Sequence, residues 1–499
     1  MKILLIDPPF YRLMGFYNRY FPLGLVSIGT VLAEAGHDVA IYDADCNDAP
    51  SVMDYTRLGE YQAAYLETFG RPGHPVWTQM RRTIESEKPD VVGISIWTTY
   101  AASAFHVAGL AKQWRADVPV IMGGPHATVK ADEILRLCPA VDYVLRGQSE
   151  QTIVELVERI AHRRDDFESL DGLSFRDNGA VRHSRWEKQI PDLDRLPSPD
   201  RSLLMNHDRY SPEDMGLIMT SRGCPFSCTF CATHTNCVRY RTIANIIAEI
   251  RQVRRRYGTN QFSFKDDSFT VDRRRVADFC AALTAENLNI NWECNTRVDL
   301  INEEMLACMK RAGCNSIKVG VESGSEAVLE RMNKRIGLDQ IRAAARLLGQ
   351  TGIHWTAYFL IGTPGETEKD VYKTLDLMYE IKPDFASIGV YEPFPGTAMF
   401  EEGIRRGLVK AEMTREEFYV TLPKDYYKTD GRRQVDTIEA ARFAVLESEI
   451  KAKFHAYNKG WGRLLKRARS RAKLYVHHPA ALAADFKKFR SWSGAGRTP

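Results

Sequence analysis

The first third of the chain alternates short apolar runs with stretches of helical periodicity. The apolar runs are KILLID, DVAIYD, DVVGISIW, VPVIMGG and VDYVLRG. Helical patterns lie between them, among them GLVSIGTVLAEAG and the amphipathic segment from Ala101 to Trp114. This rhythm is typical of a doubly wound parallel α/β sheet, so we expect a Rossmann-like domain over residues 1–160.

Four predicted loops fall at the carboxyl ends of these strands, which is the edge where such sheets bind ligands. They are Asp7-Pro8-Pro9, Ser95 to Thr99, Gly123-Gly124-Pro125-His126 and Gly147 to Glu150. Each glycine taken singly is explained as a turn residue, and His126 as a solvated turn histidine. Four such loops at one edge favour a binding site.

A second alternating series predicts a partial barrel over residues 211–400. Its strands are GLIMTSRG, QFSFKDD, INWECNTRVD, SIKVGVES, HWTAYFLIG and FASIGVYEPF, each separated by a helix-length pattern. Six such units suggest a (β/α)6 barrel of TIM type, with its site at the carboxyl ends of the strands. Residues 161–210 are expected to be a linker, with a small hairpin at Asn178-Gly179 and the proline-rich stretch PDLDRLPSPD.

From residue 401 to the end we expect a helical, basic region. Residues 451–499 hold thirteen Lys and Arg against one acid, Asp485, whereas the net charge of the whole chain is only +4. A solvated helix is the favoured interpretation; a surface for an anionic membrane is the lesser alternative. Nucleic acid is not expected, since no aromatic platform or recognition motif accompanies the charge. The sequence shows neither a long apolar run nor a signal peptide, which predicts a cytoplasmic protein.

The segment SRGCPFSCTFC places Cys224, Cys228 and Cys231 in a CxxxCxxC arrangement after a predicted strand. Three thiolates can hold three irons of a four-iron four-sulfur cubane and leave the fourth iron open to another ligand. The alternative is a structural zinc site that uses Cys237 as a fourth ligand, although its spacing fits no common zinc pattern. Cys280, Cys294, Cys308 and Cys314 match no ferredoxin pattern, so we expect them to be buried thiols.

This motif on the first loop of a six-unit barrel resembles the radical S-adenosylmethionine superfamily. The resemblance implies that Lys265-Asp266-Asp267 takes the place of the usual Gly-Gly-Glu segment, which contacts the methionine amino group. It implies further contacts from VGVESGSE, NTRVD and LIGTPGET, and from the aromatic residue between the last two cysteines. The implied S-adenosylmethionine contacts are Phe230, Asp266, Asp267, Arg297, Glu322, Ser323 and Gly362. An internal salt bridge between Glu322 and Arg297 is the alternative.

The amino-terminal domain resembles the cobalamin-binding domain found in one branch of that superfamily. Ser95-Ile96-Trp97 and Gly123-Gly124, 28 residues apart, resemble two of its three motifs, but Asp7-Pro8-Pro9-Phe10 lacks the histidine of the first. The missing imidazole would be the lower ligand of cobalt, so we expect a five-coordinate or water-bound metal. A plain nucleotide domain is a poorer alternative, since no GxGxxG follows the first strand. The implied cobalamin contacts are Asp7, Pro8, Pro9, Ser95, Trp97, Thr98, Thr99, Gly123, Gly124, His126, Gly147 and Glu150.

The two resemblances together imply a cobalamin-dependent radical enzyme. The expected activity is methylation of an unactivated carbon of a small-molecule metabolite, through a 5′-deoxyadenosyl radical and methylcobalamin. Electrons would come from a flavodoxin- or ferredoxin-type donor. The alternative is a non-methylating enzyme of the same architecture, such as an anaerobic oxidative cyclase or a ring-rearranging enzyme. A non-catalytic sensor is disfavoured, because it would have little use for the S-adenosylmethionine segments.

Overall fold

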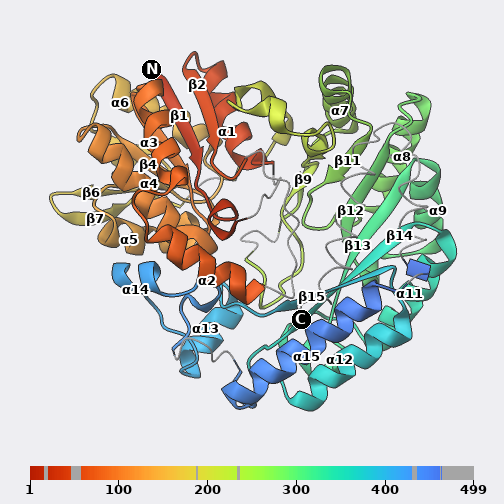
Figure 1. Ribbon diagram of the computed structural model, residues 1–499. Coiled ribbons are helices and arrows are strands. Elements are labelled where there is room, and N and C mark those ends of the chain that lie inside the picture. Colours follow the sequence, from red (N-terminus) through yellow and green to blue (C-terminus); the bar gives the residue numbers. More distant parts are fainter. Residues whose placement is uncertain are drawn as a thin grey trace.

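The computed structural model describes residues 1–15, 21–46, 58–186, 189–232, 237–429, 435–460 and 462–463. Two α/β parts stand side by side, and the carboxyl-terminal helices run beneath them (Figure 1). In the described residues the first part is built on a sheet of seven strands in the order β2-β1-β3-β4-β5-β6-β7. These strands are β1 (Lys2–Asp7), β2 (Asp38–Asp43), β3 (Val91–Ser95), β4 (Val120–Gly123), β5 (Tyr143–Leu145), β6 (Leu173–Asp177) and β7 (Ala180–His183).

Strands β1 to β5 are parallel, which confirms the predicted doubly wound sheet. Strands β6 and β7 form the hairpin predicted at Asn178-Gly179. β6 also pairs antiparallel with β5. The hairpin therefore belongs to the first sheet and not to a linker, because the exposed edge of β5 offers it backbone partners.

Helices cover both faces of this sheet. They are α1 (Leu23–Glu34), α2 (Leu58–Phe69), α3 (Pro75–Glu87), α4 (Ala101–Trp114), α5 (Pro125–Leu137) and α6 (Glu150–Ala161). Ile3 and Leu5 of β1 pack in a core that includes α1, α6 and the barrel, whereas Leu4 and Ile6 pack in a core with α3, α4 and the carboxyl-terminal region. Alternate side chains of a strand point to opposite faces, so β1 holds both layers together.

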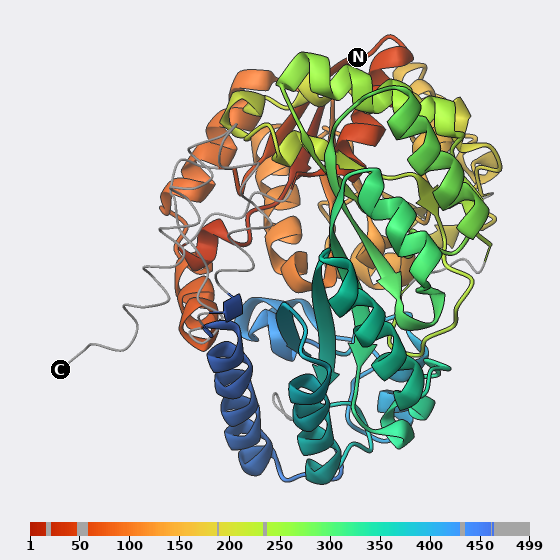
Figure 2. The same cartoon turned by 90° about the vertical axis from the view of Figure 1, so that its right-hand side faces the viewer.

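The second part is a parallel sheet in the order β15-β14-β13-β12-β11-β8. Its strands are β8 (Leu217–Ile218), β11 (Gln261–Phe264), β12 (Asn291–Arg297), β13 (Cys314–Glu322), β14 (His354–Ile361) and β15 (Phe385–Val390). Among the described strands β8 and β15 do not pair with each other, so this sheet is open there. Its outer side carries helices, seen towards the viewer in Figure 2. They are α7 (Ile243–Tyr257), α8 (Arg273–Ala285), α9 (Glu303–Arg311), α10 (Glu326–Arg331), α11 (Leu338–Thr351) and α12 (Glu368–Ile381).

The first predicted barrel strand, GLIMTSRG, is divided in two. After β8 the chain leaves the parallel sheet, and β9 (Ser221–Arg222) pairs antiparallel with β10 (Arg239–Tyr240). The Thr220 backbone N–H donates to Asp266 Oδ1 at 2.6 Å, which withdraws this backbone group from the sheet. The prediction of one continuous strand is therefore wrong. The cysteine segment instead connects the two strands of a separate two-stranded ribbon.

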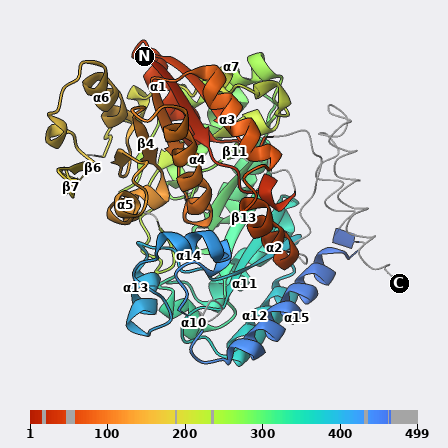
Figure 3. The same ribbon diagram turned by 60° about the vertical axis from the view of Figure 1, so that its left-hand side comes forward.

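The carboxyl-terminal region is helical, as expected. It contains α13 (Ala398–Arg405), α14 (Arg415–Val420), the 3-10 helix η10 (Pro423–Asp425) and α15 (Ala440–Asn458). α13 and α14 lie below the first sheet and α15 beside α12 (Figure 3). Most of the predicted basic tail lies outside the described residues. Within the described part of the chain, every helix is too short or too polar to cross a membrane.

Candidate cofactor site

The three cysteines lie on the loop between β9 and β10. Cys224 and Cys228 are partly buried and Cys231 is exposed. The tip of the loop is held by backbone bonds, because the Thr229 N–H donates to Met332 O at 2.9 Å and the Met399 N–H donates to Thr229 O at 2.8 Å. The loop is thus fixed between the end of α10 and the start of α13.

Positive charges lie beside the thiols. Arg297 Nη1 is 3.5 Å from Cys228 Sγ. Burial raises the pKa of Cys228, but Lys334 and Arg297 act against that rise; the pKa of Cys224 is also raised by burial. Nearby cations favour thiolates, the form in which cysteine binds iron, so this donor set fits an iron-sulfur cluster.

Glu322, Lys334 and Arg297 form one charged group next to the cysteine loop. Lys334 Nζ is 2.6 Å from Glu322 Oε1, while Arg297 donates to Asp299 at 3.0 Å and to the Lys334 carbonyl at 2.6 Å. The alternative of a direct Glu322–Arg297 salt bridge is therefore wrong, since each has a different partner. Sequence reasoning missed Lys334, which stands in no motif.

The backbone around Glu322 is adapted to this group. Glu322 has a φ of 69°, in the left-handed region, and lies at a register shift between β13 and β14. A Cβ on Gly320 would lie 2.8 Å from Lys334 Nζ and would also meet the Glu322 carboxylate. Strained backbone of this kind persists only where its surroundings hold it, and it gathers at functional sites.

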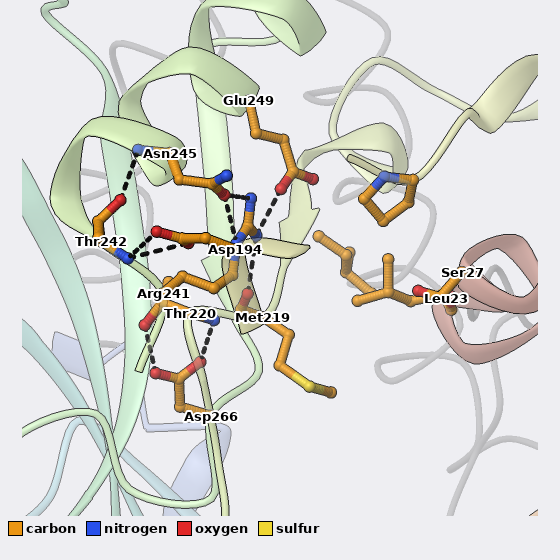
Figure 4. A network of polar contacts seen from close by, with 12 residues as sticks. Leu23, Ser27, Asp194, Met219, Thr220, Arg241, Thr242, Asn245, Glu249 and Asp266 are labelled. Atoms are coloured by element: carbon orange, nitrogen blue, oxygen red, sulfur yellow. Dashed lines mark hydrogen bonds and ion pairs between the residues drawn. The ribbon is translucent and has the colours of Figure 1, made fainter. Parts of the chain in front are cut away.

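The two adjacent aspartates after β11 have different surroundings. Asp266 is 1% exposed and accepts hydrogen bonds from the Thr220 N–H, the Thr220 hydroxyl and Ser221 Oγ, as Figure 4 shows for Thr220. Asp267 instead lies near the Gly223 N–H, which lowers the pKa of this carboxyl, and close enough to Cys224 to raise the pKa of that thiol. Burial, and then Asp266, raise the pKa of Asp267. Of the two predicted contacts, the structure brings only Asp267 to the cysteines.

The remaining predicted S-adenosylmethionine residues differ in accessibility. Phe230 packs on an apolar cluster of Val328, Met332, Tyr391 and Met399. Ser323 is fully buried, and its hydroxyl lies 3.1 Å from Thr374 Oγ1, which makes it a support of the β13 loop. Gly362 has a φ of 83°, and its N–H donates to the buried carboxylate of Glu366 at 2.6 Å. Burial raises the pKa of Glu366 to about 7.

At the carboxyl edge of the first sheet, acidic side chains lie beneath the predicted cobalamin loops. Tyr100 donates to Asp7 Oδ1 at 3.3 Å, and Asp45 accepts from three successive backbone N–H groups, beginning at Phe10. Burial raises the pKa of Asp43 to about 7 and that of Asp45 to about 6. Burial, with these two neighbours, raises the pKa of Asp7 well above its usual range. Pro8 and Pro9 are buried.

The next two loops contribute an exposed ring and a tight backbone contact. Trp97 is 52% exposed at this edge, which offers a flat face to a large ring system, while Ser95, Thr98 and Thr99 are partly exposed. Gly124 has a φ of 120°, and a Cβ there would lie 2.8 Å from Ile96 O, so only glycine fits beside Gly123. These features fit a bound corrin.

His126 is neither a solvated turn residue nor a group at the surface of this edge. It is 1% exposed, its Nδ1 lies 3.0 Å from Thr98 Oγ1, and Phe418 and Tyr427 cover its ring. Burial lowers its pKa to about 3, so the ring is neutral. The solvated alternative is therefore wrong; the ring supports the Thr98 loop from below.

Gly147 and Glu150 lie where the two α/β parts meet. The Gly147 N–H donates to Thr128 Oγ1 at 2.9 Å, and Glu150 forms an ion pair with Arg222 of β9. The Glu150 carboxylate is thus engaged with the barrel and not turned to an open cofactor edge. A pocket of about 90 Å³ lies beside this pair, between α1 and the barrel, and Figure 4 shows Leu23, Ser27, Arg241 and Glu249 around it.

Two further regions were not indicated by the sequence. A polar pocket of about 340 Å³ opens among alternate residues of the barrel strands, including Lys265, Glu293 and Lys318. Glu392 follows β15 near Lys428 of the carboxyl-terminal region, and burial raises its pKa to about 7. The helix η10 also packs against the Thr98–Tyr100 turn. The barrel, the cobalamin edge and the carboxyl-terminal region therefore meet close to Glu392.

The four other barrel cysteines gather in space despite their irregular spacing. Cys308 lies close enough to Cys280, and Cys294 close enough to Cys314, to raise the pKa of these thiols. Burial raises the pKa of Cys280 and Cys314 far above the usual range, which keeps these thiols neutral. Cys280, Cys294 and Cys314 are buried as expected, and Cys308 is partly exposed. Cys237 is exposed beside β10.

Comparison with known proteins agrees with this geometry. Residues 218–378 match the radical SAM superfamily and residues 14–157 match the B12 binding domain. An uncharacterised methyltransferase of Pyrococcus horikoshii is 32% identical over 82% of this chain and 84% of its own length. An anaerobic magnesium-protoporphyrin IX monomethyl ester cyclase of Rubrivivax gelatinosus is 29% identical over 65% of this chain and 60% of its own length.

Among solved structures, a radical S-adenosylmethionine methyltransferase from Kitasatospora setae, with cobalamin and a 4Fe-4S cluster bound, superposes with a TM-score of 0.64. That likeness covers 83% of this chain and 79% of the other at 17% identity, so it concerns the fold. Sequence matches of both domains over most of the chain decide the family. The chain belongs to the radical S-adenosylmethionine enzymes that carry a B12-binding domain, and its cofactors are a 4Fe-4S cluster, S-adenosylmethionine and cobalamin.

Proposed function

We propose that this enzyme transfers a methyl group from S-adenosylmethionine to an unactivated carbon of a small-molecule metabolite. The observation that carries the proposal is the contact of the loop after β5 with the ribbon that bears the cysteines, through Glu150 and Arg222. This contact would bring the proposed cobalamin edge towards the loop that carries the cysteines. A relative in Pyrococcus horikoshii that is named as an uncharacterised methyltransferase supports methyl transfer.

The cluster would be held by Cys224, Cys228 and Cys231. S-adenosylmethionine would lie against Asp267, Arg297, Glu322, Phe230 and the Gly362 turn, and cobalamin against the Asp7, Trp97 and Gly123 loops. When bound, these groups supply a 5′-deoxyadenosyl radical and a transferable methyl group. Ser323 and His126 support the loops from within, and we assign them no direct contact.

The side chains of the protein would balance the charges beside the cofactors and exclude water from the site. Lys334 balances Glu322, and Arg297 keeps a cation beside Cys228. The substrate would lie near Glu392, where three parts of the chain meet, and the η10 and Thr98–Tyr100 turns would close that space. A dry site protects a reactive radical from side reactions. A flavodoxin- or ferredoxin-type donor would supply the electron.

Product counting with S-adenosylmethionine deuterated in its methyl group tests the reaction. Methylation of an unactivated carbon should place the label in the product and form 5′-deoxyadenosine and S-adenosylhomocysteine in equal amounts. Cys228→Ala should form neither 5′-deoxyadenosine nor labelled product, while Cys237→Ala should behave as wild type. Turnover of the true substrate without transfer of label would refute the methyltransferase proposal.

The second candidate is an oxidative cyclase that does not methylate. The cyclase of Rubrivivax gelatinosus, which matches over 65% of this chain, is the observation in its favour. Such a reaction would yield 5′-deoxyadenosine without S-adenosylhomocysteine. The same experiment therefore separates the two candidates.

A further inference from the structure

The cysteine loop stands on a ribbon whose two strands each carry an arginine. Arg222 of β9 pairs with Arg239 of β10 across the ribbon. Arg222 precedes Cys224 by two residues, so a shift of this arginine moves the first cluster ligand directly. The ribbon is only two residues long on each side, and its own backbone pairing cannot fix its direction.

Both arginines reach the same loop of the cobalamin domain. Gln148 Oε1 accepts from Arg239 Nη1 at 3.0 Å and from Arg222 Nη1 at 3.5 Å, and Arg222 Nη2 forms the ion pair with Glu150. Arg239 Nη1 also donates to Ile190 O at 2.7 Å. The four side chains of Gln148, Glu150, Arg222 and Arg239, which we call the latch, thus join two domains at the root of the cysteine loop.

Glu150 and Arg239 of the latch are buried, Gln148 and Arg222 are partly buried, and the latch is tied to the cobalamin side. The side chains of Glu150 and Arg222 are 7% and 19% exposed, and Gly147 is tied to Thr128. Buried pairs of this kind add little net stability, but loss of one partner leaves an unpaired charge, so arrangements of the two domains that break the pair are disfavoured. Apolar packing also joins the two domains, because one core holds side chains of β1, α1, α6 and the barrel, but a pocket of about 90 Å³ remains beside the latch.

We propose that the latch sets the distance and orientation of the cluster loop relative to the cobalamin edge, with Glu150, Gln148, Arg222 and Arg239 as positioning residues. The inference rests on the proposed function only in that both cofactors serve one substrate. Misplacement of reacting groups by about 1 Å can lower a rate on the order of 100-fold, so such a reaction needs a defined spacing.

The test measures the spacing itself in the holoenzyme. Reduced 4Fe-4S cluster and cob(II)alamin are both paramagnetic, and pulsed electron paramagnetic resonance reports their magnetic coupling. The variants are Glu150→Arg, Arg222→Glu and the exchanged double variant, with Gln148→Ala and Glu150→Gln as milder changes. The matched control is the exchange of Arg136 and Glu412, an exposed pair 2.8 Å apart that also joins distant segments.

Each single charge reversal should shift or broaden the coupling while iron content and cobalamin binding stay at wild-type levels, and the double exchange should restore it. The control exchange should change nothing. Where a reversal prevents folding, Gln148→Ala and Glu150→Gln decide, and both should broaden the coupling. Unchanged coupling in all cofactor-loaded variants, or a double exchange no better than the singles, would overturn the proposal. No turnover is needed, so a failure here is distinct from a failure to transfer methyl.

Discussion

At the scale of single residues, the charged side chains beside the cysteine thiols form ion pairs in the described structure. Lys334 neutralises Glu322, and Asp299 binds Arg297 through both of its oxygens. The side chains of Lys334 and Glu322 are 6% and 11% exposed. A charge buried to this degree is tolerated only with its partner in place, because water cannot reach it.

Removal of the Lys334 ammonium group should therefore destabilise the protein. We expect Lys334→Met to lower the free energy of unfolding by about 3 kcal/mol, since Glu322 is left buried and unpaired. Anaerobic urea denaturation measures this. The double variant with Glu322→Gln should recover most of the loss, because no unpaired charge remains. A single variant as stable as wild type would show that Glu322 is solvated.

The acids beneath the cobalamin loops predict a dependence of stability on pH. Burial raises the pKa of Asp43 from 3.8 to about 7 in the folded chain, so the folded state favours the protonated carboxyl more than the unfolded state does. The contribution of Asp43 to the free energy of unfolding is fully present below about pH 4 and is lost as the pH rises through 7. Asp43→Asn cannot ionise and should gain at least about 1 kcal/mol on wild type between pH 5 and pH 8. Urea denaturation at both pH values checks this; a constant difference would contradict it.

At the scale of elements, the loop that carries the cysteines depends on the junction between β8 and β9. Asp266 binds the Thr220 N–H and the hydroxyls of Thr220 and Ser221, and this turns the chain from the parallel sheet into the ribbon. Its neighbour Asp267 lies beside Cys224 instead. Of two adjacent carboxylates, one thus holds the β8–β9 junction and the other lies beside a cysteine of the loop.

Matched variants separate these two roles. Asp266→Ala should lose on the order of 3 kcal/mol of stability, because it leaves buried donors unsatisfied, and should retain less iron after reconstitution. Asp267→Asn should keep wild-type stability and iron but bind S-adenosylmethionine more weakly. Denaturation, iron analysis and equilibrium binding supply the three readouts. If Asp267→Asn lowered stability and Asp266→Ala weakened only S-adenosylmethionine binding, the two roles would have to be exchanged.

At the scale of the whole molecule, the carboxyl-terminal region completes the cobalamin domain. Phe418 of α14 packs edge-on against Phe105 of α4 and His126 of α5. Tyr427 donates to Glu133 of α5 at 2.8 Å. The face of the first sheet that carries α4 and α5 is therefore covered by residues more than 290 positions further along the chain.

Truncation of Phe418, which is fully buried, should loosen the first domain. We expect Phe418→Ala to cost about 3–5 kcal/mol and to speed hydrogen exchange in α4 and α5. Val420→Ala on the same helix is the control, because Val420 is 72% exposed and should change stability by less than about 0.5 kcal/mol. Unchanged exchange in α4 and α5 would mean that the first domain holds its core without this region.

The sequence by itself determined both parallel sheets, the hairpin at Asn178-Gly179 and the cysteine motif of the cluster, whereas cobalamin and S-adenosylmethionine were implied by the resemblance to a known family. Strand periodicity, turn residues and cysteine spacing are local properties, so they are readable without a structure. The split of the first barrel strand was not readable, because the side chain that causes it, Asp266, lies 46 residues from Thr220.

Only the tertiary structure decided which charges meet. Glu322 pairs with Lys334 and not with Arg297, Glu150 crosses to Arg222, and Phe418 buries His126. Each of these contacts joins segments that carry no shared pattern, and its energy depends on burial and on the partner that arrives. Local sequence contains neither quantity, because both arise only when distant elements pack against one another.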